Sequence, residues 1–332
     1  MFTKKISVQL LDFMFRSLSA ILLIITVLSG GGCLHRLTTR PITPNIVHSR
    51  EITREASTAM EMRQWSEARK KLETAVKLNP KDADIRRNYS EVLWQMDKKS
   101  ESLEQLNAAI KIRENENNPD GSLQILLAEK LLQLNNIQAA EKAASRATDL
   151  LPKDYRGWVL HGRTQSAQGY GCQIQGKVEQ ANGFYHRASL DYYRGLALVP
   201  SGSGQNREFL AELATVQMRM QQPQRALSSW QNLERLYMTE PAPIDVIYGK
   251  AETYATLKRW DDAASTYRVA LEREPGNPVH YLRVAQMLAS SERFMEASSM
   301  LAKARELAPS RPEIPAILQQ IEIAQTDRQR NL

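Results

Sequence analysis

The strongest constraint in this chain is a set of small and apolar residues that recurs at offsets of four and three, with proline five residues later. Five copies keep the whole pattern: Ala68, Leu72, Ala75 and Pro80; Ala140, Ala144, Ala147 and Pro152; Ala188, Tyr192, Gly195 and Pro200; Ala263, Tyr267, Ala270 and Pro275; and Ala297, Leu301, Ala304 and Pro309. Two weaker copies lack the proline: Ser102, Leu106 and Ala109; and Ala226, Trp230 and Leu233. These offsets place the residues on one stripe of a helix, where small side chains let a neighbouring helix approach closely. Proline lacks a backbone donor and ends the helix.

A second helical pattern precedes each stripe, so the chain is predicted to fold as helix hairpins. Tyr281, Ala285 and Leu288 form one such preceding stripe, and Phe294 supplies an aromatic residue at the turn that follows it. The prolines that close the last two copies are 34 residues apart. A period of this length indicates an array of stacked hairpins rather than a single globular core.

These residues resemble the tetratricopeptide repeat, a helix hairpin of 34 residues. The resemblance implies an all-α, right-handed superhelical solenoid of about seven hairpins over residues 49–311. We expect the units at 49–82, 83–116, 121–154, 155–202, 207–240, 244–277 and 278–311, the fourth with an insert near 169–183.

Residues 312–332 continue the apolar periodicity and are predicted to form a cap helix and tail. Ile314, Ile317, Leu318 and Ile321 lie at helical spacing. A solenoid otherwise ends with an unburied apolar face, so a cap is expected there.

Charge is concentrated before the repeats. The formal net charge is +7, and residues 1–50 contribute +5 of it, from six Lys and Arg residues against Asp12 alone. The repeats therefore carry a nearly balanced mixture of both signs. This distribution does not favour a nucleic-acid partner, which attracts a basic face.

The N-terminal segment, 1–33, has the layout of an export signal. Basic residues precede the apolar run 18–28, and Ser29 and three glycines lead to Cys33. The run is shorter than a membrane span of about 20 residues and fits a signal peptide. Charge before the apolar run predicts that the repeats lie outside the cytoplasmic membrane, on the periplasmic side.

Cys33 resembles the modified residue of a bacterial lipoprotein signal, whose thiol is joined to diacylglycerol. Gly31 and Gly32 fit that motif, whereas Gly30 stands where the family usually has an apolar residue. The sequence therefore leaves three alternatives: lipidation at Cys33, ordinary cleavage and an uncleaved anchor. Residues 34–48 contain two prolines and no helical stripe, and they are predicted to be a flexible linker.

Cysteine use excludes a disulfide framework, because Cys33 and Cys172 are the only two in the chain. Cys172 lies in the insert near 169–183, which we expect to be a loop extension. A cysteine with a nearby histidine, here His186, is the minimal arrangement for thiol catalysis. Activation also needs a positioned base and a positive environment, and the sequence indicates neither.

The lack of other chemical motifs in the sequence favours a protein without enzymatic activity. The chain has no Gly-rich phosphate loop, no histidine pair at metal-ligand spacing and no serine in a nucleophile elbow. His161 lies on a first-helix stripe and is interpreted as a packing residue. We therefore expect no catalytic residue, no metal and no cofactor.

The resemblance implies that the first helices of the units line a concave groove for a protein or peptide. Residues off the packing stripe are the candidates for this partner-binding groove: Met60, Arg87, Glu91, Trp94, Ile125, Glu129, Leu132, Arg163, Met218, Tyr248, Glu252 and Gln286. The inward Asn with which some relatives grip a C-terminal carboxylate is absent from every unit, so capture of a chaperone tail is not expected.

The sequence thus predicts a non-enzymatic protein–protein interaction scaffold that is tethered to a membrane of the bacterial cell envelope. The alternative is an accessory or regulatory subunit of an envelope enzyme or export system, for polysaccharide or for protein secretion. An enzyme in its own right would have to use Cys172.

Replacing Cys33 tests the anchoring hypothesis. Cys33→Ser removes the thiol that would carry the lipid, so we expect an unprocessed precursor or a soluble product and no incorporation of labelled fatty acid. Radiolabelled palmitate in growing cells, with the wild-type chain as control, provides the measurement. A wild-type chain that takes up no label would contradict lipidation.

Overall fold

The computed structural model describes residues 43–200, 204, 206–237 and 240–330, and these residues form helices and turns without a strand. Segment 1–33, Cys33 and most of the predicted linker lie outside them. The helices are α2 Pro44–Glu61, α3 Trp65–Leu78, α4 Ala83–Gln95, α5 Lys99–Asn115, α6 Gly121–Gln133, α7 Ile137–Leu150, α8 Tyr155–Ile174, α9 Val178–Leu198, α10 Arg207–Arg219, α11 Pro223–Arg235, α12 Ile244–Thr256, α13 Trp260–Arg273, α14 Pro278–Ser290, α15 Phe294–Leu307 and α16 Glu313–Arg330.

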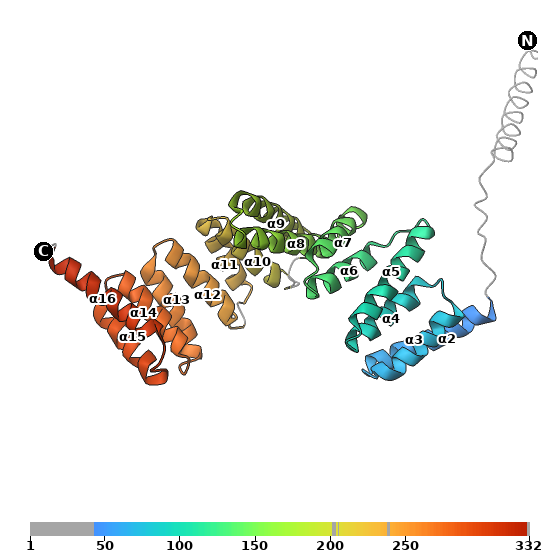
Figure 1. Ribbon diagram of the computed structural model, residues 1–332, viewed down its shortest axis with the longest axis horizontal. Coiled ribbons are helices and arrows are strands. Elements are labelled where there is room, and N and C mark those ends of the chain that lie inside the picture. Colours follow the sequence, from blue (N-terminus) through green and yellow to red (C-terminus); the bar gives the residue numbers. More distant parts are fainter. Residues whose placement is uncertain (1–42, 201–203, 205, 238–239, 331–332) are drawn as a thin grey trace, which may run out of the picture.

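Consecutive helices pair as hairpins, from α2 with α3 to α14 with α15. The last six predicted units each contain one pair, and in the first unit α2 begins before the predicted boundary at 49. Figure 1 shows the array bent into an arch, with α6 to α11 near its crest and the two ends descending on either side. The all-α superhelical repeat architecture predicted from the sequence is confirmed. The first helices α6 and α8 lie below their partners α7 and α9 in this view, on the inner side of the crest.

The alanine stripes lie in the core. Ala68, Leu72 and Ala75 of α3 are fully buried and share a cluster with Ala56 of α2 and Ile85 of α4. The second helix of a unit therefore packs against its own first helix and also against the first helix of the next unit. Such contact with neighbours alone is what a stacked repeat requires.

Prolines set the ends of the second helices as predicted. The residue before Pro80, Pro152 or Pro275 has left the helical region, with ψ between 65° and 77°. A residue before proline is driven out of the α region by the ring, which explains why these helices end there.

The turn inside every hairpin has three residues, and the second has a positive φ. This residue is Arg63, Asp97, Asn135, Gly176, Gln221, Lys258 or Glu292, with φ between 55° and 72°. In the first hairpin Gln64 N donates to Ala59 O at 2.8 Å and Arg63 N donates to Met60 O at 3.0 Å. This pattern satisfies the last carbonyls of the first helix and reverses the chain.

The predicted flexible linker, 34–48, is wrong at its C-terminal end, because α2 begins at Pro44. Proline at the first helical position is favourable, since its missing N–H is one of those a helix start leaves unpaired and its φ already suits the helix. Pro44 therefore starts the helix rather than marking unstructured chain.

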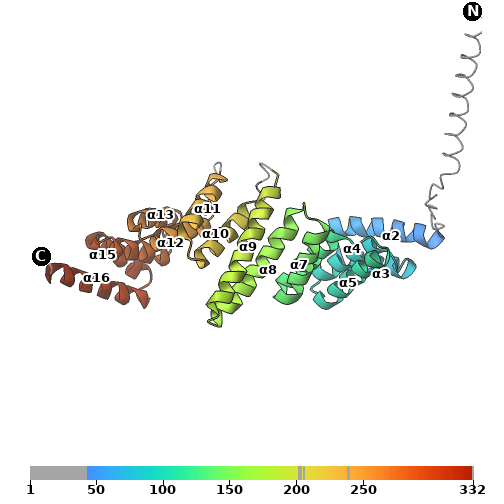
Figure 2. The same cartoon turned by 90° about the horizontal axis from the view of Figure 1, so that it is seen from above.

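The predicted loop extension near 169–183 is also wrong. The insert lengthens both helices of the fourth unit, so that α8 has 20 residues and α9 has 21, against 13 in α10 and in α11. Figure 2 shows this hairpin reaching beyond its neighbours. Its glycines serve packing and the turn: a Cβ at Gly169 would lie 2.8 Å from Tyr185 Cε1, and Gly176 adopts a φ of 72°.

The predicted cap helix is α16. Ile314, Ile317 and Ile321 are at most 6% exposed and join the core cluster of the last two hairpins. They cover the apolar face that α14 and α15 would otherwise present to solvent.

Enlarging one stripe alanine tests the packing register. Ala297 is fully buried, so Ala297→Leu should lower the free energy of unfolding by about 1–3 kcal/mol through overpacking. Ala302→Leu is the matched control, because Ala302 lies exposed on the same helix. Urea unfolding followed by circular dichroism gives both values, and equal, small losses would contradict the register.

Candidate functional site

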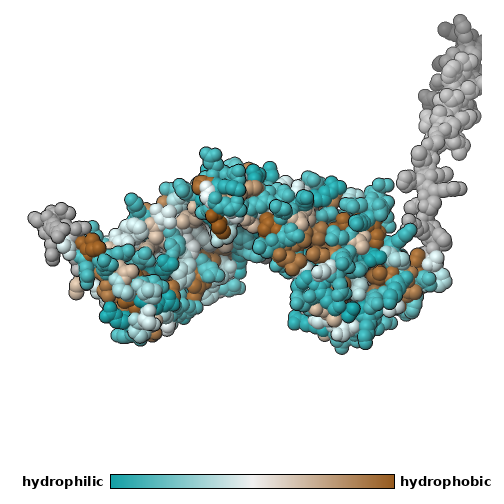
Figure 3. All heavy atoms as spheres, viewed as in Figure 1, coloured by the Kyte–Doolittle hydropathy of each residue, from teal (hydrophilic) through white to brown (hydrophobic). Residues whose placement is uncertain are grey.

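Two adjoining hollows lie on the inner side of the arch, over the first helices of units three to six. The smaller, of about 300 Å³, is lined by Glu129, Tyr155, Arg156, Val159, Leu160, Arg163, Glu208 and Phe209. The larger, of about 550 Å³, is lined by Arg163, Ser166, Ala167, Tyr170, Tyr192, Ala211, Glu212, Thr215, Arg219, Trp230, Asp245 and Gly249. Arg163 lines both, so the two hollows adjoin. Together they are called the inner groove, and the larger hollow is called the crest pocket. Figure 3 shows the surface hollowed beneath the crest, with apolar residues beside the hollow.

Arg163 is neutralised from within the chain. Its guanidinium lies 2.7 Å from a carboxylate oxygen of Glu208 and 2.9 Å from one of Glu212, so α8 and α10 are joined across the groove floor. Burial raises the pKa of the Tyr192 phenol beside this pair well above its ordinary value, and the negative charge of Glu212 adds to the effect. Tyr192 is therefore a neutral group in the wall of the crest pocket.

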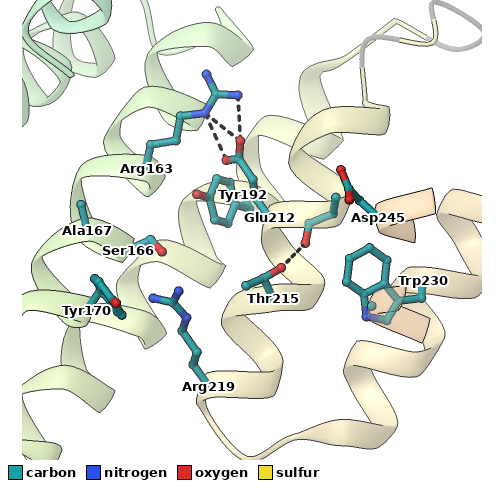
Figure 4. Close-up of a pocket in the computed structure, with 12 residues that line it drawn as sticks. Arg163, Ser166, Ala167, Tyr170, Tyr192, Glu212, Thr215, Arg219, Trp230 and Asp245 are labelled. Atoms are coloured by element: carbon teal, nitrogen blue, oxygen red, sulfur yellow. Dashed lines mark hydrogen bonds and ion pairs between the residues drawn. The ribbon is translucent and has the colours of Figure 1, made fainter. Parts of the chain in front are cut away.

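Arg219 lies at the C-terminal end of α10 with a different set of partners. Its guanidinium carbon is 4.7 Å from the ring centre of Tyr170 and 5.6 Å from that of Tyr185. Nη1 donates to the Tyr185 hydroxyl at 3.2 Å. Figure 4 shows this side chain pointing from α10 toward the α8 wall of the pocket.

Trp230 reaches from α11 to the α12 side of the same pocket (Figure 4). The side chain is only 5% exposed, and its Nε1 donor has no hydrogen-bond partner among the described residues. Gly249 makes this position possible, because a Cβ there would overlap the indole carbons. The indole thus lines the pocket with its ring, while its donor is buried and has no partner among the described residues.

The predicted groove residues do not lie on one continuous surface in the structure. Arg163 and Glu129 line the inner groove, and burial raises the pKa of Glu129 despite the nearby basic residues. Met60, Leu132 and Met218 are half-buried against the cores of their units. Ile125 is 3% exposed and belongs to the core, so its prediction as an open groove position is wrong.

Glu91 and Trp94 come together at the second unit, with Lys130 from the third. Lys130 is 3% exposed, its Nζ donates to Glu91 Oε2 at 3.0 Å, and it lies 4.3 Å from the Trp94 ring centre. Lys99 covers the same indole at 4.1 Å. Trp94 is therefore 8% exposed and serves the contact between units, while Arg87 stays exposed nearby.

Tyr248 and Glu252 form a third set near the C-terminal end. The Tyr248 hydroxyl lies 2.5 Å from His280 Nδ1, and Tyr267 donates its hydroxyl hydrogen to Glu252 at 2.6 Å. Burial raises the pKa of Tyr267, with the Glu252 carboxylate adding to the shift. Arg283 links Glu252 at 3.7 Å with Gln286 at 3.5 Å.

Sequence reasoning missed Tyr170, Arg219 and Trp230 as pocket residues. Tyr170 was part of an insert interpreted as a loop, and Trp230 was assigned to the packing stripe. A signal for Trp230 was present, because a tryptophan is larger than the leucine or tyrosine that fills this position elsewhere.

The described residues contain no group of three His, Cys, Asp or Glu side chains that could hold a metal ion. Cys172 is half-buried, and its Sγ faces Gln180 Oε1 at 4.0 Å, an amide that cannot act as a base. In the part of the chain that the structure describes, no helix has the length and apolar character to span a bilayer.

Comparisons with known proteins agree with this architecture. A tetratricopeptide repeat family model matches residues 53–120 and 212–278. No curated protein sequence matches the chain. The C-terminal part of a TPR repeat-containing protein from Cytophaga hutchinsonii superposes with a TM-score of 0.60 at 12% identity, covering 80% of this chain and 99% of that one.

Two further solved structures are similar in the same way. A tetratricopeptide repeat protein from Parabacteroides merdae gives a TM-score of 0.52 at 13% identity over 82% of this chain and 98% of that one. YrrB, described as a TPR protein with an unusual peptide-binding site, superposes with a TM-score of 0.50 at 19% identity. The match covers 64% of this chain and 97% of that one. At these identities the likeness concerns the fold, which is that of a tetratricopeptide-repeat solenoid.

His161, interpreted from sequence as a packing residue, joins three helices of units three and four. Its Nδ1 lies 2.8 Å from Asp191 Oδ2, and its Nε2 lies 3.7 Å from Glu141 and 3.3 Å from the Gln165 amide. Burial opposes the charged form, but the two carboxylates outweigh it, so the pKa of His161 is raised. The protonated ring therefore stabilises the folded state.

This arrangement predicts a pH dependence. A raised pKa in the folded state means that the stabilisation is complete below the unfolded value of about 6.5 and is lost as the pH rises through the folded value. Urea unfolding at pH 6 and pH 8 should show a decrease in stability that His161→Gln diminishes. His186→Gln is the control, since that histidine is exposed on α9. An unchanged decrease in His161→Gln would contradict the assignment.

Proposed function

We propose that this tetratricopeptide-repeat solenoid is a non-enzymatic scaffold that binds an extended segment of a protein partner along the inner groove. The scaffold acts in the bacterial cell envelope, where a lipid on Cys33 holds it at a membrane with its repeats on the periplasmic side. The order of basic, apolar and small residues before Cys33 supports this location.

The observation that carries the proposal is the inner groove itself. It crosses four successive units and combines a wall of aromatic rings with half-buried charges of both signs. Concave sites with apolar walls and a few convergent polar groups are where ligands bind. A chain segment, with backbone donors and acceptors at regular intervals, suits a depression that is long and open rather than enclosed.

Two further observations are consistent with a binding role. The polar side chains of the groove are held by partners from different helices, as in the link from Arg163 to Glu208 and Glu212, so the surface is rigid before a ligand arrives. YrrB, a fold relative, is described as having a peptide-binding site.

A bulky residue on the groove floor tests this function. Thr215 is exposed on α10 and lines the crest pocket, so Thr215→Trp should fill the pocket and weaken partner binding at least tenfold, about 1.4 kcal/mol. Affinity purification from detergent-solubilised envelope, followed by mass spectrometry and a titration of the recovered partner, provides the measurement.

Thr74→Trp is the matched control. Thr74 is exposed on the second helix α3, where its hydroxyl donates to the carbonyl four residues earlier, as that of Thr215 does. If the partner is still captured by Thr215→Trp but not by Thr74→Trp, the binding surface lies on the outer side of the solenoid and the proposal is wrong.

A further inference from the structure

We propose that the crest pocket is a subsite for one acidic side chain, Asp or Glu, of the bound segment, and that Arg219 receives its carboxylate. The inference rests on the proposed function and specifies the chemistry of the partner. Its distinctive feature is that the lengthened α8–α9 hairpin builds the subsite.

The position of Arg219 is set by two aromatic rings. Tyr170 and Tyr185 lie against the guanidinium. Within the described part of the chain one of its five N–H donors has a hydrogen-bond partner, the Tyr185 hydroxyl at 3.2 Å. Contact with aromatic faces holds a guanidinium in place without neutralising it. The remaining donors are available to a group in the pocket.

The other two arginines of the groove are paired within the chain, Arg156 with Asp154 at 2.6 Å and Arg163 with two carboxylates. Arg163 has two carboxylates of the chain within 2.9 Å, so its charge is already matched. Arg219 has no carboxylate within ion-pair distance among the described side chains. A half-buried cation that lines a pocket and lacks an anionic partner selects a ligand carboxylate, which it can bind through two parallel hydrogen bonds.

The insert supplies the rings. A first helix of 13 residues starting at Tyr155 would end at residue 167, as α10 ends 13 residues after its start. Tyr170 therefore lines this pocket because α8 is longer than α10. Its side chain is 50% exposed and lies beside Arg219. The longer hairpin thus extends the groove wall and supplies the aromatic rings against which the Arg219 guanidinium packs.

Two more residues define the ligand. Trp230 lines the pocket and contributes apolar ring surface to it, whereas its Nε1 is itself buried and is not exposed to a ligand. Asp245 is exposed at the α12 side of the same pocket and would repel a second carboxylate. The subsite therefore fits an isolated Asp or Glu rather than an acidic run.

A peptide library tests the inference. The full chain is used to select from random dodecapeptides with acetylated and amidated termini, so that no terminal carboxylate is present. We expect enrichment of peptides with a single Asp or Glu, and a Glu→Gln peptide should bind the wild-type chain at least tenfold more weakly.

In Arg219→Gln this difference should fall below twofold, whereas Arg225→Gln, which removes an exposed arginine from the nearby α11, should retain it. Tyr170→Ala should weaken the Glu peptide and Tyr170→Phe should not, because the ring and not the hydroxyl seats Arg219. Binding should also decrease as the salt concentration rises.

The outcomes separate the inference from the function on which it rests. Peptides whose binding is blocked by Thr215→Trp are bound in the groove. If such peptides show no acidic preference, prefer an acidic run, or keep the acidic preference in Arg219→Gln, the proposed subsite is wrong and the scaffold function remains. Selection only of peptides with a free C-terminus, in a parallel unamidated library, would overturn the subsite as well. Absence of any peptide binding, together with envelope capture that Thr215→Trp does not affect, would overturn both.

Discussion

Close contact between helices at the alanine stripes is the interaction on which the rest of this structure depends. Ala68 and Ala75 have no exposed surface, and their helix contacts the first helix of its own unit and that of the next. Because small side chains set the distance between helices, they also set how far each unit turns relative to its neighbour. The curvature of the arch, and with it the inner groove, follows from these contacts.

The groove acquires its chemistry from residues that the stripes leave free. Arg163 meets Glu208 and Glu212 of the next unit, while Arg219 meets aromatic rings instead of carboxylates. Two arginines on successive first helices therefore differ in function: one stabilises the floor, and the other keeps its charge for a ligand. The difference comes from which side chains the neighbouring unit presents.

The helices and their pairing could be predicted from the sequence because the stripe at Ala263, Tyr267 and Ala270 has a period that only a helix satisfies. The prolines of 34–48 predict a flexible linker and the insert near 169–183 predicts a loop, whereas in the structure Pro44 starts a helix and Gly176 turns a hairpin. The site was harder to predict. Spacing within one helix finds its outward residues, but it cannot tell that Lys130 of the next unit covers Trp94.

The length of the α8–α9 hairpin has a consequence for how such an array can change. A helix advances about 100° per residue, so seven added residues return a side chain to within about 20° of its former direction. An insertion of two or five residues would instead turn the Ala188 stripe away from its neighbours. An added heptad in each helix of a hairpin, as in α8 beside α10 and in α9 beside α7, therefore widens the solenoid while the stripe still faces its neighbours.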